Sequence, residues 1–310
     1  MAQITVVGSL NMDFVVLVER LPAPGETGSG HDFQMLPGGK GANQACAAGK
    51  LGSATCRTQM IGRVGNDVFA DHLKSSLAAA GVDVGYVQAT RSQPTGVALI
   101  WVDRYGQNSI VVSPGANHTL AWSDVPAMGA AFRGSRFALF QLESPLDTVD
   151  AALRLARREG AQTMLDPAPA QALGAGTLAN VDILTPNETE ALMLLGLPAG
   201  RLSLADAPDI ARSLRAQGPG CIVLKMGEQG CFYLDAGRQI VSPGFRVDVK
   251  DATAAGDTFN AGLAVALAEG MPIEDALRFA NAAAALSVMR VGAQASIPSR
   301  EEVAGFLAKQ

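Results

Sequence analysis

Charged and aromatic residues are scarce in this 310-residue sequence. Charged side chains make up 17% of the chain and aromatic side chains 5%, and the net charge is −5. Basic residues gather into no block, so the composition excludes nucleic acid and anionic membrane surfaces as partners. Hydrophobic residues reach 48% of the chain, which excludes an intrinsically disordered protein.

Cysteine and histidine are also few and scattered. The four cysteines form no C-x-x-C pair, and the three histidines lie too far apart in sequence for a metal site of the His-x₃-His type. This pattern is typical of buried, reduced thiols, so we expect a cytoplasmic protein. The chain enters the strand-like Ile4–Val7 directly, and we expect no signal peptide. The apolar run Phe14–Val18 is far shorter than a membrane span.

Short apolar runs alternate with amphipathic segments through most of the chain. The runs are Ile4–Gly8, Phe137–Leu142, Thr163–Leu165, Ile183–Thr185 and Ile222–Leu224. Because they are continuously apolar, they predict strands buried on both faces of a parallel sheet. The segments between them end at glycines such as Gly160 and Gly218, as helices do. This order predicts an α/β fold with a doubly wound, mostly parallel sheet flanked by helices.

Two segments depart from this alternation, roughly 12–36 and 95–113. Both are rich in β-branched residues, and the second predicts a hairpin that turns near Asp103–Gly106. The intervening Gly38–Gly81 is typical of two helices with a short strand between them. We therefore expect one domain over residues 1–310 with a small, discontinuous β-sheet that serves as a lid or a dimer surface.

Polar residues follow the predicted strands. Asn11 and Asp13 come after the first strand, and Glu143, Asp166 and Asn187 follow three later strands. Polar residues commonly end strands, and each one alone has that simple explanation. Together they predict a ligand site, because the carboxyl ends of parallel strands meet at one edge of a sheet.

A run of small residues, Ala254–Gly256, precedes Asp257 and a helical pattern. Free amides at the start of a helix bind anions, such as a phosphate group. Asp257 lies in the first turn, within reach of that anion. For Asp257 alone, an acidic residue that complements the helix dipole is the simpler interpretation.

A glycine-rich segment, Gly38–Ala45, precedes another helical pattern. Its glycines let the backbone approach a ligand, and Asn43 can both donate to and accept from hydroxyl groups. A turn that packs a helix against the sheet explains the glycines equally well. The spacing matches neither a Walker A loop nor a G-x-G-x-x-G fingerprint.

Asn187 and Glu190 are spaced so that they share one face at a helix start. They can hold Mg²⁺ through its water ligands while phosphates fill the other positions. On spacing alone, an N-terminal helix cap is the favoured interpretation.

Taken together, these motifs resemble the ribokinase-like (phosphofructokinase-B type) carbohydrate kinases. The matching segments are Gly8–Asp13, Pro24–Thr27, Gly38–Ala45, Thr95–Ile100, Gln141–Pro145, Pro167–Ala170, Thr185–Glu190, Pro243–Phe245, Ala254–Asn260 and Gly292–Gln294. Both family signatures are present, in order, over essentially the whole chain. The resemblance implies transfer of the γ-phosphate of ATP to the 5-hydroxyl of D-ribose, and a homodimer formed through the lids.

The resemblance also implies roles for single residues. Asp257 corresponds to the catalytic base, and the amides of Ala254, Ala255 and Gly256 correspond to an anion hole. A carboxylate with an ordinary pKa of ~3.9 is a weak base for an alcohol, but phosphoryl transfer demands little proton removal until late. The sugar-binding positions are Asn11, Met12, Asp13, Gly39, Lys40, Gly41, Ala42, Asn43, Glu143 and Asp257.

The nucleotide and ions have implied positions as well. Those for ATP are Asn187, Lys225, Met226, Gly227, Glu228, Gln229, Gly230, Gly256, Asp257 and Asn281. Mg²⁺ is implied, through water, at Asn187 and Glu190. A monovalent cation, K⁺, is implied beside the anion hole, where oxygen ligands suit it. Its positions are Asp251, Thr253, Ser287, Arg290, Gly292 and Ser296.

Three residues depart from the family pattern. Ala254 stands where many relatives have glycine, and we expect the anion hole to survive because alanine keeps the amide. Lys225 replaces a threonine of some relatives. Asp166 replaces an asparagine, and we expect its charge to repel the phosphates of ATP unless Mg²⁺ intervenes.

Other functions stay open at this point. The substrate can instead be another sugar or a nucleoside, such as fructose, 2-deoxyribose or adenosine, although Asn11–Asp13 and Gly39–Asn43 favour a small, hydroxyl-rich sugar. A sugar-binding protein without activity is the remaining alternative. The presence of Gly256 and Asp257 disfavours it.

Overall fold

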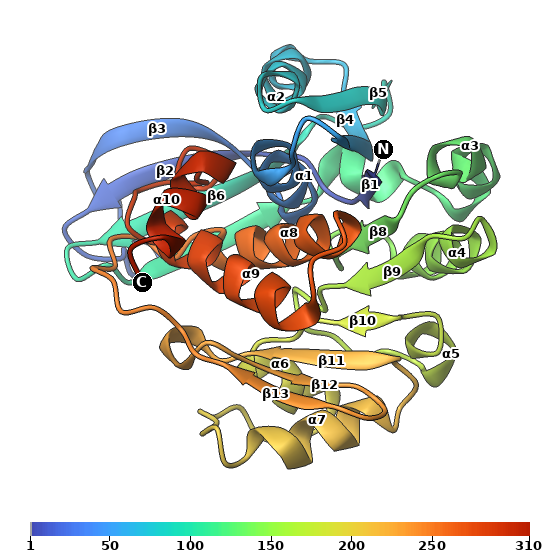
Figure 1. Ribbon diagram of the computed structural model, residues 1–310. Helices are drawn as coiled ribbons and strands as arrows, with labels where there is room; N and C mark the ends of the chain where they lie inside the picture. The colour runs from blue at the N-terminus through green and yellow to red at the C-terminus, as the bar shows by residue number, and fades with distance from the viewer. Residues whose placement is uncertain (1) are drawn as a thin grey trace.

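A computed structural model describes residues 2–310, which form two separate sheets (Figure 1). The strands of the larger sheet are β1 (Ala2–Val7), β4 (Cys56–Gly65), β5 (Val82–Thr90), β8 (Phe137–Phe140), β9 (Gln162–Leu165), β10 (Ile183–Leu184), β11 (Cys221–Lys225), β12 (Cys231–Leu234) and β13 (Gln239–Ser242). Its nine strands lie in the order β13-β12-β11-β10-β9-β8-β1-β4-β5. The seven strands from β11 to β5 in this order pair in parallel, and β12 and β13 add an antiparallel edge. The predicted doubly wound, mostly parallel α/β fold is confirmed.

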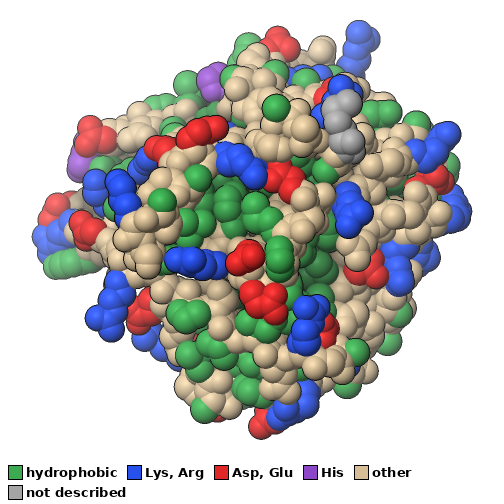
Figure 2. All heavy atoms as spheres, viewed as in Figure 1, with side chains coloured by type: hydrophobic (Ala, Val, Ile, Leu, Met, Phe, Trp, Pro, Cys, Tyr) green, Lys and Arg blue, Asp and Glu red, His purple; other side chains and the backbone are tan. Residues whose placement is uncertain are grey.

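Helices cover both faces of the large sheet. On one face lie α1 (Lys40–Leu51), α2 (Val68–Ala79), α8 (Ala255–Ala268), α9 (Ile273–Ser287) and α10 (Arg300–Leu307). On the other lie α3 (Gly129–Phe132), α4 (Leu146–Arg158), α5 (Ala175–Leu178), α6 (Glu188–Leu194) and α7 (Ala207–Arg215). Figure 2 shows apolar atoms exposed over the α8–α9 face, with acidic and basic side chains around them.

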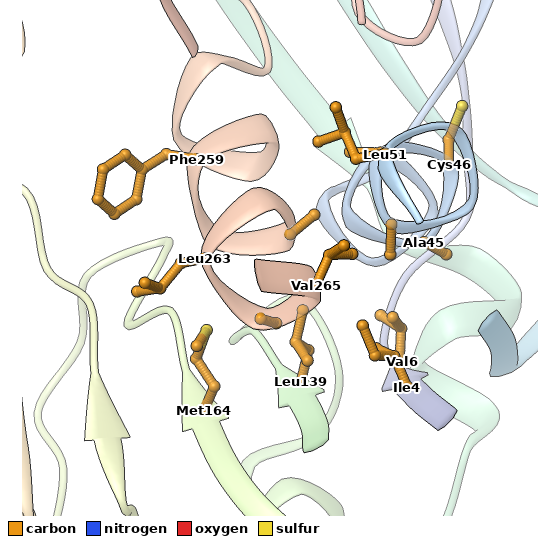
Figure 3. Close-up of a cluster of buried hydrophobic side chains, with 14 of the residues drawn as sticks. Ile4, Val6, Ala45, Cys46, Leu51, Leu139, Met164, Phe259, Leu263 and Val265 are labelled. Atoms are coloured by element: carbon orange, nitrogen blue, oxygen red, sulfur yellow. The ribbon is translucent and has the colours of Figure 1, made fainter. Parts of the chain in front are cut away.

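The central strands are apolar without alternation because their two faces pack into two different cores. In β8, Phe137 and Leu139 pack into the core under α1 and α8, whereas Ala138 and Phe140 pack into the core under α4. Figure 3 shows Phe259 and Leu263 of α8 above Met164 of β9. This packing fixes α8 across the middle of the sheet, so its first turn lies at the carboxyl ends of the strands.

The smaller sheet joins β2 (Asn11–Val18), β3 (Gly30–Gly38), β6 (Gly96–Asp103) and β7 (Asn108–Ser113) in the order β3-β2-β6-β7. It extends to one side of the main body in Figure 1. The predicted discontinuous lid sheet is confirmed, and β6 and β7 form the predicted hairpin. Asn11 begins β2 and Gly39 directly follows β3, so both ends of the β2–β3 segment of the lid connect to the site.

All four cysteines carry free thiols, but only three of them are buried, because Cys56 is half-exposed. Within residues 2–310, no helix has both the length and the apolar character needed to cross a bilayer.

Candidate active site

A cavity of about 420 Å³ opens beyond the carboxyl ends of β9, β10 and β11, at the start of α8. Its walls carry four acidic side chains and two lysines. The lining residues are Lys40, Asp166, Ala168, Asn187, Glu188, Thr189, Glu190, Lys225, Gly227, Ala252, Ala254, Ala255, Gly256 and Asp257. Of the polar residues predicted to meet at one edge of the sheet, Asp166 and Asn187 thus line one cavity, whereas Asn11, Asp13 and Glu143 are not among its lining residues.

The first turn of α8 has no side-chain cap. Its N-cap, Ala254, has left-handed backbone angles (φ 59°, ψ 12°), and the Ala254 carbonyl accepts from the Thr258 amide and hydroxyl, both at 2.8 Å. The Ala255 amide donates to the Ala252 carbonyl over 3.2 Å. Of the three amides predicted to face an anion, that of Ala255 thus already has a protein partner.

Asp257 is buried and held by two amide groups. Asn43 Nδ2 donates to its Oδ2 at 3.1 Å, and Gln44 Nε2 donates to its Oδ1 at 3.0 Å. Burial raises the pKa of Asp257 to about 6; the Lys40 charge opposes this rise, and the Asp166 charge adds to it. The expectation of an ordinary carboxyl pKa is wrong, and Asp257 is a stronger base than a solvated aspartate.

Gln44 contacts two buried carboxylates of the candidate site, and the sequence motifs did not single it out. Its Nε2 donates to Asp166 Oδ2 at 3.1 Å as well as to Asp257. Its Oε1 accepts from Gln141 Nε2 at 2.7 Å, which turns the amino group of Gln44 towards the two carboxylates. The one feature of the sequence that could have drawn attention to Gln44 is its position directly after Asn43, near the start of α1.

A second group of side chains offers acceptors suited to hydroxyls. Glu143 Oε2 accepts from the Ser9 hydroxyl and, at 3.0 Å, from the Lys40 amide. Burial and the charge of Glu143 raise the pKa of Asp13 to about 7. The Asn43 Oδ1 atom is buried without a hydrogen-bond partner among the described residues, which fits a hydroxyl donor from a bound sugar.

Asn11 and Met12 are both buried at the start of the lid. The Oδ1 atom of Asn11 accepts from Asn117 Nδ2 at 2.8 Å. Asn117 also bonds both backbone groups of Leu10, so it fixes the turn into β2. Sequence reasoning missed Asn117, which lies far along the chain in a short 3-10 helix with no distinguishing pattern.

The glycine-rich segment has a packing function as well as a position in the site. Gly39, the N-cap of α1, has φ +88°. A Cβ on Gly41 would lie 2.6 Å from the Gly8 carbonyl carbon, so these two backbone segments touch. The packing interpretation is right for Gly41, while the neighbouring Lys40 lines the cavity.

Asn187 and Glu190 form a reciprocal cap at the start of α6. The Asn187 amide donates to Glu190 Oε2 at 2.7 Å, and the Glu190 amide donates to Asn187 Oδ1 at 2.8 Å. The cap favoured from spacing is therefore present, and both residues also line the cavity.

The predicted nucleotide positions divide into two groups. Lys225 and Gly227 line the cavity, and Glu228, Gln229 and Gly230 continue the turn from β11 to β12. Met226 is buried. Asn281 is also buried and donates to the Ser242 hydroxyl and carbonyl, at 3.0 and 3.1 Å. In this structure Asn281 thus holds the end of β13, away from the cavity walls.

Asp166 and Lys225 form an ion pair in the cavity wall. Lys225 Nζ lies 2.9 Å from Asp166 Oδ1, and both side chains are largely buried, with 13% and 4% exposed. The expectation that only Mg²⁺ could compensate the Asp166 charge is wrong. The two departures from the family pattern compensate one another.

The positions implied for K⁺ lie on two loops joined by Asp251. Its Oδ1 accepts from the Thr253 amide at 2.9 Å, and its Oδ2 accepts from the Gly292 amide at 2.8 Å. The hydroxyls of Ser287 and Ser296 donate to backbone carbonyls, which leaves their lone pairs for a cation. Arg290 pairs with Glu302 of α10, so only its backbone carbonyl suits such a site.

This geometry combines an uncapped helix start, a buried carboxylate of raised pKa and acceptors for hydroxyls, which are groups that phosphoryl transfer to an alcohol can use. The profile described as "pfkB family carbohydrate kinase" matches residues 1–300, and the chain belongs to this family.

Similar proteins cover nearly the whole chain. A ribokinase from Haemophilus influenzae is 40% identical over 304 residues, 98% of each chain. A ribokinase from Bacillus subtilis is 40% identical over 309 residues, 99% of this chain and 100% of the other. The structure of an Arabidopsis thaliana ribokinase complexed with ribose and ATP superimposes with a TM-score of 0.91, at 35% identity and 99% coverage of both chains.

Proposed function

We propose that this protein transfers the γ-phosphate of ATP to the 5-hydroxyl of D-ribose, giving ribose 5-phosphate and ADP. The observation that carries the proposal is the pairing of Asp257 with Asn43, whose buried Oδ1 atom has no hydrogen-bond partner within residues 2–310. The similarity to ribokinases supports ribose as the sugar.

The proposed sugar-binding residues offer more hydrogen-bond acceptors than donors. Asp13 and Glu143 present carboxylates, and one carboxylate can accept from two neighbouring hydroxyls. Asn11, Met12, Gly39, Lys40, Gly41 and Ala42 complete the proposed sugar-binding set. Asp257 takes the proton from the hydroxyl as the hydroxyl oxygen attacks phosphorus. Its raised pKa of about 6 keeps it ionised at neutral pH while making it a better base.

The cavity fits a nucleotide together with a divalent cation. Its four acidic side chains outnumber its two lysines, so triphosphate binding requires added positive charge. Asn187 and Glu190 are the proposed water-mediated Mg²⁺ positions. The helix-start amides of Gly256 and Asp257 and the turn that follows Lys225 are the proposed phosphate contacts. ATP bound there supplies the phosphoryl group.

A monovalent cation is proposed between the two loops that Asp251 joins. Its oxygen ligands come from Asp251, Thr253, Ser287, Arg290, Gly292 and Ser296, several through the backbone. The cation would hold the loop before Ala254 in place and so support the start of α8. An Asp251→Ala variant should therefore lose potassium activation while keeping its fold, as far-ultraviolet circular dichroism can show.

The lid sheet is proposed as the surface of a homodimer. Its large exposed apolar side chains are Phe33, Met35, Leu99, Ile110, Val111 and Val112. By register, Ala98 and Val112 share the face of Asp13, and Ile100 and Ile110 continue it. Met35, Leu99 and Val111 lie on the opposite face, with Phe14. A sugar at Asp13 covers only the near end of this face, and a second lid would cover the rest.

Light scattering tests the dimer. We expect Ile110→Asp to be a monomer at micromolar concentration, because a charge would be buried in the interface. Tyr105→Asp, at the tip of the β6–β7 hairpin and outside the sheet face, should stay dimeric. A monomeric unmodified protein would refute the interface. We propose that the lid and the main body of each chain form one catalytic domain over residues 1–310. We also propose that the protein acts in the cytoplasm.

The central experiment is a coupled ADP-release assay with ATP and Mg²⁺. The substrates are D-ribose, 2-deoxyribose, D-fructose, adenosine and no sugar, each with potassium and with a non-activating cation. Fast turnover on ribose that potassium enhances is the expected result. Preference for another substrate would keep the role of Asp257 and remove the ribose assignment. No turnover with any substrate would favour the sugar-binding alternative.

A further inference from the structure

The ion pair between Asp166 and Lys225 lies in the cavity wall, beside the start of α8. Lys225 ends β11, and Asp166 follows β9, two strands away in the sheet. A Cβ added to Gly256 would lie 3.4 Å from Lys225 Nζ. The ammonium group therefore lies beside the first turn of α8, one residue before Asp257. A cation and the positive end of a helix meet at one point, where an anion gains from both.

Asp166 connects that cation to the base. Its Oδ1 holds Lys225 at 2.9 Å, and its Oδ2 accepts from Gln44 at 3.1 Å. The same Gln44 Nε2 atom donates its second hydrogen to Asp257 Oδ1, over a nitrogen–oxygen distance of 3.0 Å. Gln141 fixes the orientation of the Gln44 amide from the other side. Lys225, Asp166, Gln44 and Asp257 thus form one continuous chain of polar contacts.

We infer that Lys225 binds the transferred phosphoryl group and that Asp166 and Gln44 are positioning residues, which hold Lys225 and the Asp257 carboxylate in register for in-line transfer. The inference rests on the proposed kinase function and extends it to three side chains. An ammonium group has three hydrogens to donate. Lys225 therefore donates to an oxygen of the γ-phosphate with the hydrogens that Asp166 does not use.

The charge arrangement explains why both residues are needed. Without Lys225, Asp166 would be an unpaired buried carboxylate that faces the phosphates of ATP, which is costly in itself and repels the nucleotide. Without Asp166, Lys225 would lose its anchor, and Gln44 would keep only one of its two acceptors. The neutral pair removes both charges together, so it is the informative variant.

The experiment compares Lys225→Met, Asp166→Asn and the double variant with the unmodified protein. Calorimetry gives the Kd of a non-hydrolysable ATP analogue and of ADP, each with Mg²⁺ and without sugar. We expect Lys225→Met to weaken binding of the analogue about tenfold or more and binding of ADP by less than about threefold, since only the analogue carries a γ-phosphate that Lys225 can contact. Equal weakening of both ligands would overturn the assignment of Lys225.

Asp166 is tested by separating kcat from KM. We expect Asp166→Asn to leave the KM for ATP unchanged or lower, because a negative charge is removed, and to reduce kcat about tenfold, because Lys225 and Gln44 are no longer held. The double variant should have a higher kcat than Lys225→Met alone, because the unpaired carboxylate is gone. Additive losses in the double variant would overturn the pairing.

Two controls separate this inference from simple loss of structure. Arg212→Met removes one partner of an exposed ion pair with Asp209 on α7 and should change neither Kd nor kcat. If Lys225→Met fails to fold, the double variant, which leaves no unpaired charge, supplies the same comparison of the analogue with ADP. An inactive unmodified protein would refute the proposed kinase function, but the calorimetric comparison would still decide the role of Lys225.

Discussion

Asn43 Nδ2 donates a 3.1 Å hydrogen bond to Oδ2 of Asp257, which follows it by 214 residues in the chain. The other end of the same amide, Oδ1, is buried without a partner among the described residues. One side chain therefore orients the base and presents an acceptor next to it. In the proposed reaction, a sugar hydroxyl that donates to Asn43 Oδ1 would therefore lie close to the Asp257 carboxylate.

Replacing Asn43 tests this double role. We expect Asn43→Ala to raise the KM for the sugar about tenfold to a hundredfold, because a buried hydrogen bond to the substrate is lost. Asn180→Ala is the matched control, since its exposed amide bonds only the Gly176 carbonyl. Steady-state kinetics with saturating ATP is the measurement. A KM within twofold of the unmodified value would exclude Asn43 from the sugar site.

Removal of the base has a separate signature. Asp257→Asn keeps the side-chain shape and one acceptor, so nucleotide binding should change little. Turnover should fall by about 10²–10⁴, the usual contribution of a general base. Asp209→Asn, on the exposed face of α7, should have no effect. More than half of the unmodified turnover in Asp257→Asn would show that another group accepts the proton.

The raised pKa of Asp257 predicts an acid limb in the rate profile. The base acts when ionised, so kcat should fall as the pH drops through about 6. Lys40, Asn43 and Gln44 favour the ionised form, while burial and Asp166 oppose it. Gln44→Leu, which removes one donor, should move the limb to higher pH. A limb that stays near the ordinary carboxyl pKa of ~3.9 in both proteins would contradict the burial of the base.

The sequence predicts those features that local patterns encode. Continuous apolar runs located β8 and β9, and β-branched segments located the lid. The run Ala254–Gly256 located the start of α8. The antiparallel strands β12 and β13 were not predicted, because edge strands this short leave only a weak pattern.

Contacts between distant segments could not be predicted in the same way. The bridge from Gln44 to Asp166 and Asp257 depends on how α1, β9 and α8 pack against one another. The pairing of Asp166 with Lys225 spans 59 residues and leaves no spacing signal. The pKa of Asp257 follows from its burial, which exists only after the sheet and α8 have formed.

The lid aspartate should cost stability in the absence of sugar. The pKa of Asp13 is about 7 in the fold against 3.8 without it, so the fold favours the protonated form. The stability that the fold gains from holding Asp13 protonated is fully present below roughly pH 4 and is lost as the pH rises through about 7. At roughly pH 8 the unliganded protein therefore holds an ionised carboxylate in a poorly solvated place.

Asp13→Asn removes this cost. At roughly pH 8 we expect the variant to unfold at a higher temperature than the unmodified protein, with a free energy of unfolding that is higher by a few kcal/mol at most. At roughly pH 4 we expect no gain in stability. It should also lose affinity for the sugar, an exchange of function for stability. Asp209→Asn is again the control. Calorimetric melting at both pH values, without sugar, is the measurement, and an equal gain at both would contradict the pKa of Asp13.

Ala254 provides a test of backbone strain at the helix start. Its φ of 59° lies in the left-handed region, which an L-residue with a Cβ occupies at a cost of about 1–2 kcal/mol. Glycine removes that cost but loses about 0.4–1 kcal/mol through the greater freedom of the unfolded chain. Ala254→Gly should therefore raise the free energy of unfolding by roughly 0.5–1 kcal/mol.

The neighbouring residue supplies the opposite result. Ala255 is the first residue of α8, with ordinary helical geometry, so Ala255→Gly should destabilise the protein by up to about 1 kcal/mol. Urea unfolding of both variants, with equal m-values, measures the difference. Because the two substitutions are chemically identical and adjacent, opposite signs can come only from the backbone conformation. Equal destabilisation by both would show that Ala254 is not strained.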